Sequence, residues 1–462
     1  MKKSIIVLCS LIFGCINLFS QSKPNIVLIL SDDQSYTDYS FMGHPAIKTP
    51  NLDKLATEST VFRRGYVPTA LCRPALMTLA TGLYSHKNLI TGNDPAITPA
   101  NKDHVENDGK SAKEILISNI DRVGSLAKWL GNNGYVSHQS GKWWEGSFQR
   151  GGFSEGMTRG YPERGGRHGD DGLKIGREGM TPVFNFIDKS LSEKKPFFVW
   201  YAPFLPHTPH NPPERLLIKY KADGRPLAVA KYYAMCEWLD ETCGALMKHI
   251  DDKGIRKNTL VIYVTDNGWI QADKGGYKVR SKRSPFEGGT RNPIMFSWPG
   301  TIKVADRPEL CTSLDIVPTI LAATGTKGPH DFPGLNLLPK LKSGEAIARD
   351  TIYGESFAHD IADIKNPNAS LLYRWVIRGH MKLLLTYDGN PGKMKYPPQS
   401  AEAKLYDLKK DPSEGVNLAT QKPELVQELS KLLDEWYVPE GRQAGKFVKS
   451  TPKVKKPRKK KK

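Results

Sequence analysis

Polar side chains suited to binding a cation follow two strongly apolar runs of this 462-residue chain. Asp32 and Asp33 come directly after IVLILS. Asp266 and Asn267 come directly after TLVIYVT. Oxygen donors of this kind suit Ca²⁺ or Mg²⁺, and the sequence lacks the Cys and His spacing that is typical of zinc sites. We therefore expect a hard divalent cation where these two segments meet, Ca²⁺ first and Mg²⁺ as the alternative.

Both apolar runs are typical of strands buried on both faces of a sheet, and open α/β sheets bind ligands at the carboxyl ends of such strands. A third apolar segment, 195–204, is also followed by a polar cluster, PHTPH at 206–210. Strands and amphipathic helices alternate through to residues 313–325. The pattern predicts an α/β fold with a mostly parallel sheet flanked by helices, with strands at 23–33, 136–140, 195–204 and 258–268 and helices at 49–60, 123–135 and 230–254.

The pattern changes near residue 350. Short runs at 351–357, 373–389 and 403–408 alternate with turn residues, which is typical of antiparallel strands, and 423–437 is an amphipathic helix that could cover them. The predicted organisation is a signal peptide, a catalytic domain, a smaller subdomain with an antiparallel sheet and a helix, and a basic disordered tail, at residues 1–22, 23–350, 351–440 and 441–462.

The two ends of the chain bear on its location. MKKSIIVLCSLIFGCINLFSQ has the basic start and short apolar run of a secretory signal peptide, with cleavage expected around 20–22. Lipoprotein processing before Cys15 is the alternative, although Phe13 fits it poorly. No later segment has the length and apolarity of a membrane span, so we expect a periplasmic or secreted protein.

The formal charge of the chain is +19. The C-terminal tail is basic and contains no acidic residue, which favours an acidic polysaccharide over nucleic acid as its partner.

The stretch PTALCRPALMTLATGLY at 68–84 places Cys72 at the start of a predicted helix. Cys72 alone could be a buried thiol, a nucleophile or the precursor of a more reactive group. Cys236 and Cys243 are seven residues apart in a predicted helix, so their Cα atoms would be about 10 Å apart, too far for a disulfide. We expect free thiols there and at Cys311.

Seven segments together resemble the type I, formylglycine-dependent sulfatases of the alkaline phosphatase-like superfamily. They lie in the family's order between about residues 24 and 437, and they are PNIVLILSDD, the Cys-x-Pro stretch with its downstream TG, GKW, PHTPH, VTDNG, SKRSPFEGGTRNP and LYDLKKDPSEGVNLA. The resemblance implies an alkaline-phosphatase-like fold. It also implies that a formylglycine-generating enzyme oxidises Cys72 to Cα-formylglycine (3-oxoalanine).

The resemblance also assigns roles to residues. Lys142 and Lys282 would bind the sulfate oxygens, and His207 would contact the sulfate or help to protonate the leaving alcohol. One hydroxyl of the hydrated formylglycine would attack sulfur, and deprotonation of the other would release the sulfate. The cation would be held by Asp32, Asp33, the modified Cys72, Asp266 and Asn267.

Two positions depart from the family. Leu76 stands where C-x-P-x-R has arginine, and Trp144 stands where GKWH has histidine. Arg73 lies about 100° around the predicted helix, so it is not a simple substitute for the missing arginine. Other polar residues that could compensate are His86, Asn93, Asp94 and His168.

The pattern as a whole predicts an exported sulfatase for a sulfated carbohydrate, such as a marine algal polysaccharide fragment of the ulvan type. A non-catalytic carbohydrate-binding relative and a phosphoester or phosphonate hydrolase of the same superfamily are the alternatives. The Gly-rich loop 150–180 could shape the substrate pocket. Four aromatic residues near Lys142 could stack on a sugar ring or pack in the core, namely Trp143, Trp144, Phe148 and Phe153.

Overall fold

The computed structural model describes residues 23–103, 111–222, 224–329, 331–387 and 400–445. The predicted signal peptide and nearly all of the predicted basic tail lie outside these ranges, so both stay predictions. Within the described ranges, no helix combines the length and the apolarity needed to cross a membrane.

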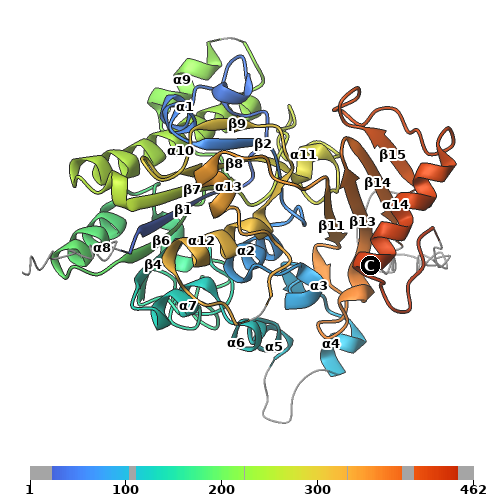
Figure 1. The fold of residues 1–462 in the computed structure, drawn as a ribbon, viewed down its shortest axis with the longest axis horizontal. Coiled ribbons are helices and arrows are strands. Elements are labelled where there is room, and N and C mark those ends of the chain that lie inside the picture. Colours follow the sequence, from blue (N-terminus) through green and yellow to red (C-terminus); the bar gives the residue numbers. More distant parts are fainter. Residues whose placement is uncertain (1–22, 104–110, 223, 330, 388–399, 446–462) are drawn as a thin grey trace, which may run out of the picture.

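A nine-stranded sheet forms the centre of the molecule (Figure 1). Its order is β10-β2-β8-β7-β1-β6-β4-β5, with β9 also paired to β2. β8 is antiparallel to β2 and β7, and the other pairs are parallel, which confirms the predicted mostly parallel sheet. The strands are β1 (Asn25–Ser31), β2 (Thr60–Tyr66), β4 (Val136–Gly141), β5 (Glu155–Gly156), β6 (Phe197–Ala202), β7 (Thr259–Thr265), β8 (Arg291–Ser297), β9 (Ala305–Arg307) and β10 (Cys311–Thr312).

Strand β1 is buried along its whole length. Leu28 and Leu30 pack into the apolar cluster on one face of the sheet, and Val27 and Ile29 pack into the cluster on the other. This alternation follows from the two-residue repeat of a strand. It explains why β1 is a continuous apolar run, as the sequence predicted.

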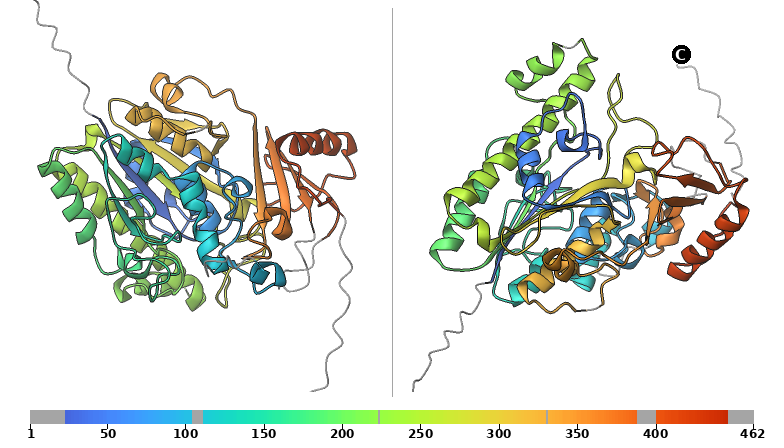
Figure 2. Two further views of the ribbon diagram at one scale, coloured as in Figure 1. Left: turned by 90° about the horizontal axis from the view of Figure 1, so that it is seen from below. Right: turned by 45° about the horizontal axis from the view of Figure 1, so that its top comes forward.

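Helices cover both faces of the sheet, as predicted (Figure 2). The cluster on one face contains residues of α2 (Cys72–Thr81), α5 (Ala112–Ile117), α6 (Asn119–Val123), α7 (Leu126–Asn132), α12 (Ile316–Thr324) and α13 (Leu338–Ser343). The cluster on the other face contains residues of α1 (Pro50–Thr57), α8 (Thr181–Ser192) and α10 (Leu227–Asp252), against which α9 (Glu214–Lys221) packs. Three short helices, α3 (Ser85–Asn88), α4 (Pro99–Asp103) and α11 (Glu287–Thr290), lie in the connections.

A second, antiparallel sheet begins at Thr351, and α14 (Pro423–Trp436) packs on it, as the sequence predicted. Figure 2 shows this unit at one end of the molecule. Trp375 packs against Tyr66 of the main sheet with ring centroids 6.2 Å apart, so an apolar interface joins the two sheets. Its strands are β11 (Thr351–Phe357), β13 (Leu371–Arg378), β14 (Met381–Thr386) and β15 (Lys404–Asp407), and a small extra pair joins β3 (Asp94–Pro95) to β12 (Asp360–Ile361).

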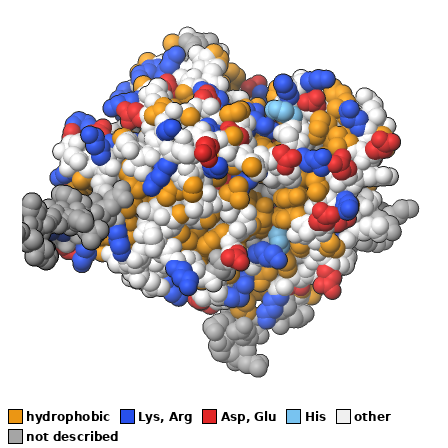
Figure 3. All heavy atoms as spheres, viewed as in Figure 1, with side chains coloured by type: hydrophobic (Ala, Val, Ile, Leu, Met, Phe, Trp, Pro, Cys, Tyr) orange, Lys and Arg blue, Asp and Glu red, His pale blue; other side chains and the backbone are white. Residues whose placement is uncertain are grey.

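The surface carries mixed charge. On the face in Figure 3, basic and acidic side chains are interspersed among apolar ones. Ten Lys and Arg, with no Asp or Glu, lie in residues 446–462, which the structure does not describe. A large part of the formal charge of +19 therefore belongs to that segment.

Candidate active site

Four neighbouring strands, in the order β7-β1-β6-β4, bring their carboxyl ends to one edge of the sheet. Asp32 follows β1, Asp266 follows β7, Lys142 follows β4, and the segment with His207 follows β6. Parallel strands carry their carboxyl ends to the same edge, so residues more than 200 positions apart meet there. Asp32, Asp266 and Lys142 thus lie together at this edge of the sheet.

Two glycines allow backbone segments at this edge of the sheet to approach each other closely. Gly141 precedes Lys142 with φ of +84°, and a Cβ there would lie 1.7 Å from the carbonyl oxygen of Ala202. Gly268, after Asn267, would bring a Cβ within 2.1 Å of the carbonyl oxygen of Gly288. A side chain fits at neither position, which gives a physical reason for the glycines of GKW and DNG.

Cys72 is the first residue of α2 and is 2 % exposed. Ligand atoms of Cys72, Asp32, Asp33 and His207 all lie within 4.8 Å of one another. Burial raises the pKa of the Cys72 thiol to about 12, against the opposing effect of Lys142 and Lys282. An unmodified Cys72 is therefore held as a thiol and not as the thiolate that nucleophilic attack requires.

The acidic groups fit a divalent cation. Oδ2 of Asp266 and Oδ1 of Asn267 are buried and have no hydrogen-bond partner among the residues that the structure describes. Burial raises the pKa of Asp32 to about 7, and it raises that of Asp266 as well. Buried carboxylates with unused oxygens are costly, and a cation that accepts these oxygens would remove the cost. Asp33 has φ of +63°, and its backbone N–H donates to Asp266 Oδ1 at 3.1 Å.

Two buried lysines lie against two of the carboxylates. Lys142 Nζ lies 2.8 Å and 2.7 Å from the two oxygens of Asp32, and Lys282 Nζ lies 2.5 Å and 2.7 Å from those of Asp33. Burial lowers the pKa of both ammonium groups, but the surrounding carboxylates outweigh it and raise both. Three carboxylates facing two ammonium groups leave an excess of negative charge, which again favours a cation.

His207 lies at the edge of this cluster, with 19 % of its side chain exposed. Its Nε2 is 3.3 Å from Asp33 Oδ2, and its Nδ1 is 2.6 Å from the carbonyl oxygen of Thr208. A carbonyl oxygen only accepts hydrogen bonds, so Nδ1 carries a proton and Nε2 is the nitrogen that faces the site. Burial, with Lys142 nearby, lowers the pKa of His207 to about 4.

The two departures from the family consensus lie in one apolar cluster. Leu76 is 5 % exposed and Trp144 is 4 % exposed, and both belong to the cluster under the main sheet. The guanidinium of Arg73 forms a buried two-pronged pair with Glu145 at 2.8 Å and 2.7 Å, and its Cζ lies 5.9 Å from the ring centroid of Trp144. Arg73 therefore ties the nucleophile helix to the GKWWEG segment and does not replace the missing arginine, as expected from its place on the helix.

The four residues considered as compensation lie in different places. His86 is buried against the C-terminal sheet, with Nδ1 2.7 Å from Glu355. Asn93 accepts from the backbone N–H of Arg73 at 3.2 Å, beside the nucleophile. Asp94 forms an ion pair with Arg167. His168 lies beside Trp144, one of the two departures, and the centroids of the two rings are 5.2 Å apart.

The aromatic residues after Lys142 are mainly core residues. Trp143, Trp144 and Phe153 are each at most 4 % exposed, and Phe148 packs on the same cluster. A guanidinium covers one ring face of Trp144, with Arg167 Cζ 4.6 Å from the ring centroid. Core packing is therefore the interpretation that the structure supports for these residues.

Cys236, Cys243 and Cys311 form no disulfide, as predicted. Cys72, Cys236, Cys243 and Cys311 are free and buried.

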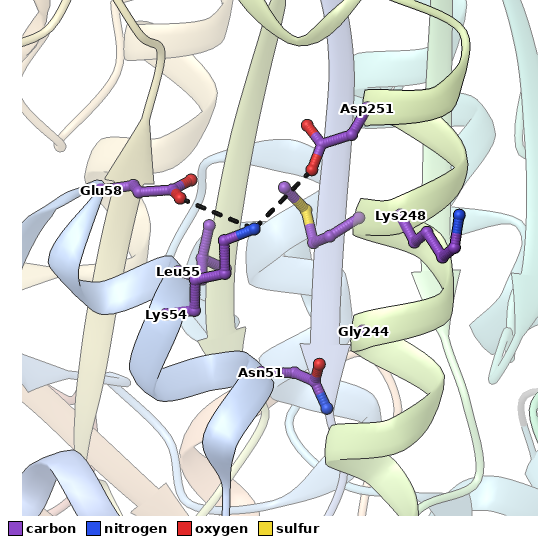
Figure 4. Close-up of a pocket in the computed structure, with 8 residues that line it drawn as sticks. Asn51, Lys54, Leu55, Glu58, Gly244, Lys248 and Asp251 are labelled. Carbon is purple, nitrogen blue, oxygen red and sulfur yellow. Dashed lines mark ion pairs between the residues drawn. The ribbon is translucent and has the colours of Figure 1, made fainter.

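A pocket between α1 and α10 shares none of its lining residues with this site (Figure 4). Lys54 there lies 4.0 Å from both Glu58 and Asp251.

Comparison with known proteins identifies the family of this chain. The family model "Sulfatase" matches residues 24–326, about two thirds of the chain. The chain belongs to the sulfatase family. A second model, "N-sulphoglucosamine sulphohydrolase, C-terminal", matches residues 275–438. The protein is thus a sulfuric ester hydrolase with an alkaline-phosphatase-like fold, which confirms the predicted family, fold and enzyme class.

Named relatives support this assignment over most of the chain. The sulfatase is 27 % identical to arylsulfatase A of Homo sapiens, over 88 % of this chain and 87 % of that protein. It is 29 % identical to N-acetylgalactosamine-6-sulfatase of Rattus norvegicus, over 74 % and 70 %. The solved structure of Ps i-CgsB in complex with k-i-k-neocarrahexaose is similar with a TM-score of 0.69 and 24 % identity, over 93 % of this chain and 95 % of that one.

Several residues of the site were not predicted from the sequence. They are Arg73, whose contacts were unknown, together with Glu145, Phe204 and Arg177. Each acts through a pair or a backbone contact between distant segments, and no local pattern of residue types signals such a contact.

Proposed function

We propose that this sulfatase is exported and hydrolyses sulfate esters of a sulfated carbohydrate, with Cys72 matured to Cα-formylglycine and Ca²⁺ in the acidic cluster. The observation that carries the proposal is the group formed by Cys72, the carboxylates of Asp32 and Asp33, and the two buried lysines. It combines a place for a divalent cation with two fixed positive charges beside one buried cysteine. That combination suits an anionic ester.

The side chains of the acidic cluster and residue 72 have separate roles in the proposed reaction. Asp32, Asp33, Asp266 and Asn267 offer the oxygens that would hold the cation, and modified residue 72 would lie against it. The cation would favour the ionised form of a neighbouring hydroxyl, and formylglycine supplies a hydrated aldehyde, which a thiol cannot.

The lysines and the histidine act on the substrate. Lys142 and Lys282 stabilise charge on the sulfate oxygens, because both ammonium groups stay protonated in the site. His207 presents Nε2 at the exposed side of the cluster. Once Nε2 is protonated beside the bound sulfate anion, it would donate to the sulfate or to the oxygen of the leaving alcohol.

A carbohydrate substrate is supported by the names of the relatives. N-acetylgalactosamine-6-sulfatase is named for a sugar sulfate, and Ps i-CgsB was solved with k-i-k-neocarrahexaose. We extend this to a sulfated oligosaccharide from a marine algal polysaccharide. Turnover of a panel of sulfated oligosaccharides, ulvan fragments included, measured as sulfate release, identifies the sugar.

The mass of one peptide tests the proposal. Trypsin releases residues 65–87 as one peptide, because Pro74 protects the bond after Arg73. In protein from its native host we expect a mass in which an aldehyde has replaced the sulfhydryl of Cys72. An alkylatable thiol in all of the material would contradict the proposed nucleophile. Comparing aryl sulfate with aryl phosphate then separates a sulfatase from a phosphoester hydrolase.

Removing the cation is expected to lower kcat/KM by on the order of 10²-fold or more, because the buried carboxylates lose their counter-ion and the nucleophile loses its activation. The measurement is sulfate release before and after chelation. Added Ca²⁺ should restore activity at lower concentration than Mg²⁺.

A binding measurement provides the control for chelation. Ca²⁺ should raise the melting temperature of the chelated protein, since a ligand that binds only the folded state stabilises it. Asp266→Asn keeps the shape of the side chain but removes its charge, so this shift should shrink in that variant. An equal shift in both proteins would place the cation elsewhere.

A further inference from the structure

One guanidinium organises the segment that carries His207. Arg177 Nη2 donates to the carbonyl oxygens of Phe204 at 2.5 Å and of His207 at 2.8 Å, and Nε donates to that of Phe204 at 2.9 Å. Arg177 Nη1 donates to Asn211 Oδ1 at 2.5 Å and to the carbonyl oxygen of Pro209 at 3.3 Å. A single side chain thus spans residues 204–211.

The same guanidinium supports the ring on which His207 lies. Arg177 Cζ is 5.3 Å from the centroid of Phe204, and the ring of Phe204 stacks on the imidazole of His207 at 4.3 Å. Lys142 Nζ also lies over Phe204, 5.2 Å from its centroid. The ring of Phe204 therefore contacts both His207 and Lys142, and the guanidinium of Arg177 packs against the same ring.

Only arginine can make this set of contacts. Its planar fork has five donors at fixed angles, whereas a lysine ammonium group is a single point of charge that reaches fewer acceptors. The contacts go mainly to backbone carbonyl oxygens, so they fix the path of the chain and not merely the rotamer of one neighbour. Arg177 lies at the end of the Gly-rich segment 150–180, and it gives that segment a defined contact with the site.

We propose that Arg177 is a positioning residue, which holds the segment 204–211 so that His207 presents Nε2 to the leaving group beside Lys142. This inference rests on the proposed function of His207. Direct contact of Arg177 with substrate is the competing explanation, and it predicts a different kinetic effect.

The test compares Arg177→Met and Arg177→Lys with the wild type on two substrates, an aryl sulfate with an acidic phenol and a monosaccharide sulfate. A contact to the leaving oxygen matters most when the leaving group is poor. We expect Arg177→Met to lower kcat on the sugar sulfate by about 10- to 100-fold and on the aryl sulfate by less than about 3-fold, with KM nearly unchanged. Arg177→Lys should fall close to Arg177→Met, because geometry and not charge is lost.

A double variant distinguishes the inference from the proposed function. If Arg177 acts through His207, then His207→Ala combined with Arg177→Met should be no slower than His207→Ala alone. Full activity in His207→Ala would refute the role of that histidine. A slow His207→Ala with a wild-type-like Arg177→Met, additive losses in the double variant, or a rise confined to KM would refute the positioning role alone.

Two further measurements keep the test decisive. Arg159→Gln is the matched control, because Arg159 lies in the same Gly-rich segment but pairs with Asp171, at 3.4 Å. Its kinetics should match the wild type. A crystal structure of Arg177→Met should show the segment 204–211 displaced. An unchanged segment would overturn the inference, whatever the activity of the protein.

Discussion

Replacing Cys72 with alanine is expected to abolish hydrolysis of sulfate esters, with a fall in kcat of about 10⁴-fold or more, as for other enzymes that lose their nucleophile. Cys72 is the residue around which the carboxylates and lysines gather. Burial raises the pKa of its thiol to about 12, so the unmodified side chain is a poor nucleophile in this position. Cys72→Ser should be nearly as inactive, because serine provides one hydroxyl and the proposed reaction uses two.

Sulfate release and thermal unfolding are the measurements for these variants. Cys243→Ala is the matched control, since Cys243 is also a free, buried thiol, 1 % exposed, but packs in the cluster on the other face of the main sheet. It should keep its activity while losing a similar buried group. Retained activity in Cys72→Ala would mean that another residue makes the first attack.

The positions of Asp32 and Asp266 at the strand ends were the part of the site that the sequence predicted best. Asp32 and Asp266 each follow a run of residues buried on both faces, and in a parallel sheet such runs end at the same edge. Local pattern and fold class together therefore placed them. Cys72, Lys142 and Lys282 carry no such local signal, and only the resemblance to a family assigned their roles.

Other features depended on the path of the chain in three dimensions. Strand β2 was not predicted, because Arg63 and Arg64 interrupt the apolar pattern of TVFRRGY in a strand that is half exposed at its centre. The pair between Arg73 and Glu145 joins residues 72 positions apart, and nothing in either segment indicates it. Arg177 contacts backbone carbonyl oxygens. Every residue has such an oxygen, so the sequence cannot indicate which ones Arg177 contacts.

The family consensus and the structure together give the departures a physical meaning. Leu76 and Trp144 replace charged or titratable residues with apolar ones, and both are buried in the same cluster. Leu76 and Trp144 thus contribute packing and, among the described residues, no side-chain hydrogen bonds. The polar contacts come instead from His207 and Arg177, which form a connected unit with Phe204.

Replacing Lys382 with methionine is expected to destabilise the protein by about 3–5 kcal/mol, the usual cost of leaving buried charges unpaired. Lys382 lies in β14 of the C-terminal sheet with its side chain fully buried, and its Nζ lies 3.1 Å from Glu287 and 3.0 Å from Glu414. Glu414 Oε2 in turn accepts from the backbone N–H of Glu287 at 2.7 Å. The variant would leave the two buried carboxylates facing each other without their shared cation, and, among the described residues, Glu287 would keep only the longer pair with Arg291 at 3.6 Å.

This group of charges also connects the two sheets to the active site. Glu287 begins α11, five residues after Lys282, and the carbonyl oxygen of Glu414 accepts from Arg280 at 2.7 Å. Loss of Lys382 should therefore loosen the segment that carries Lys282, and activity at moderate temperature should fall before global unfolding begins. Urea unfolding measures the stability, and activity over a temperature series measures the local effect.

The controls separate lost charge pairing from lost side-chain volume. Lys410→Met changes an exposed lysine near the same sheet and should alter the free energy of unfolding by less than about 0.5 kcal/mol. Combining Lys382→Met with Glu414→Gln removes one of the stranded carboxylates and should recover part of the lost stability, since the desolvation cost of that charge disappears. If the double variant is less stable than Lys382→Met, the charge of Glu414 stabilises the protein even without Lys382, and an unpaired buried carboxylate is not the cause of the lost stability.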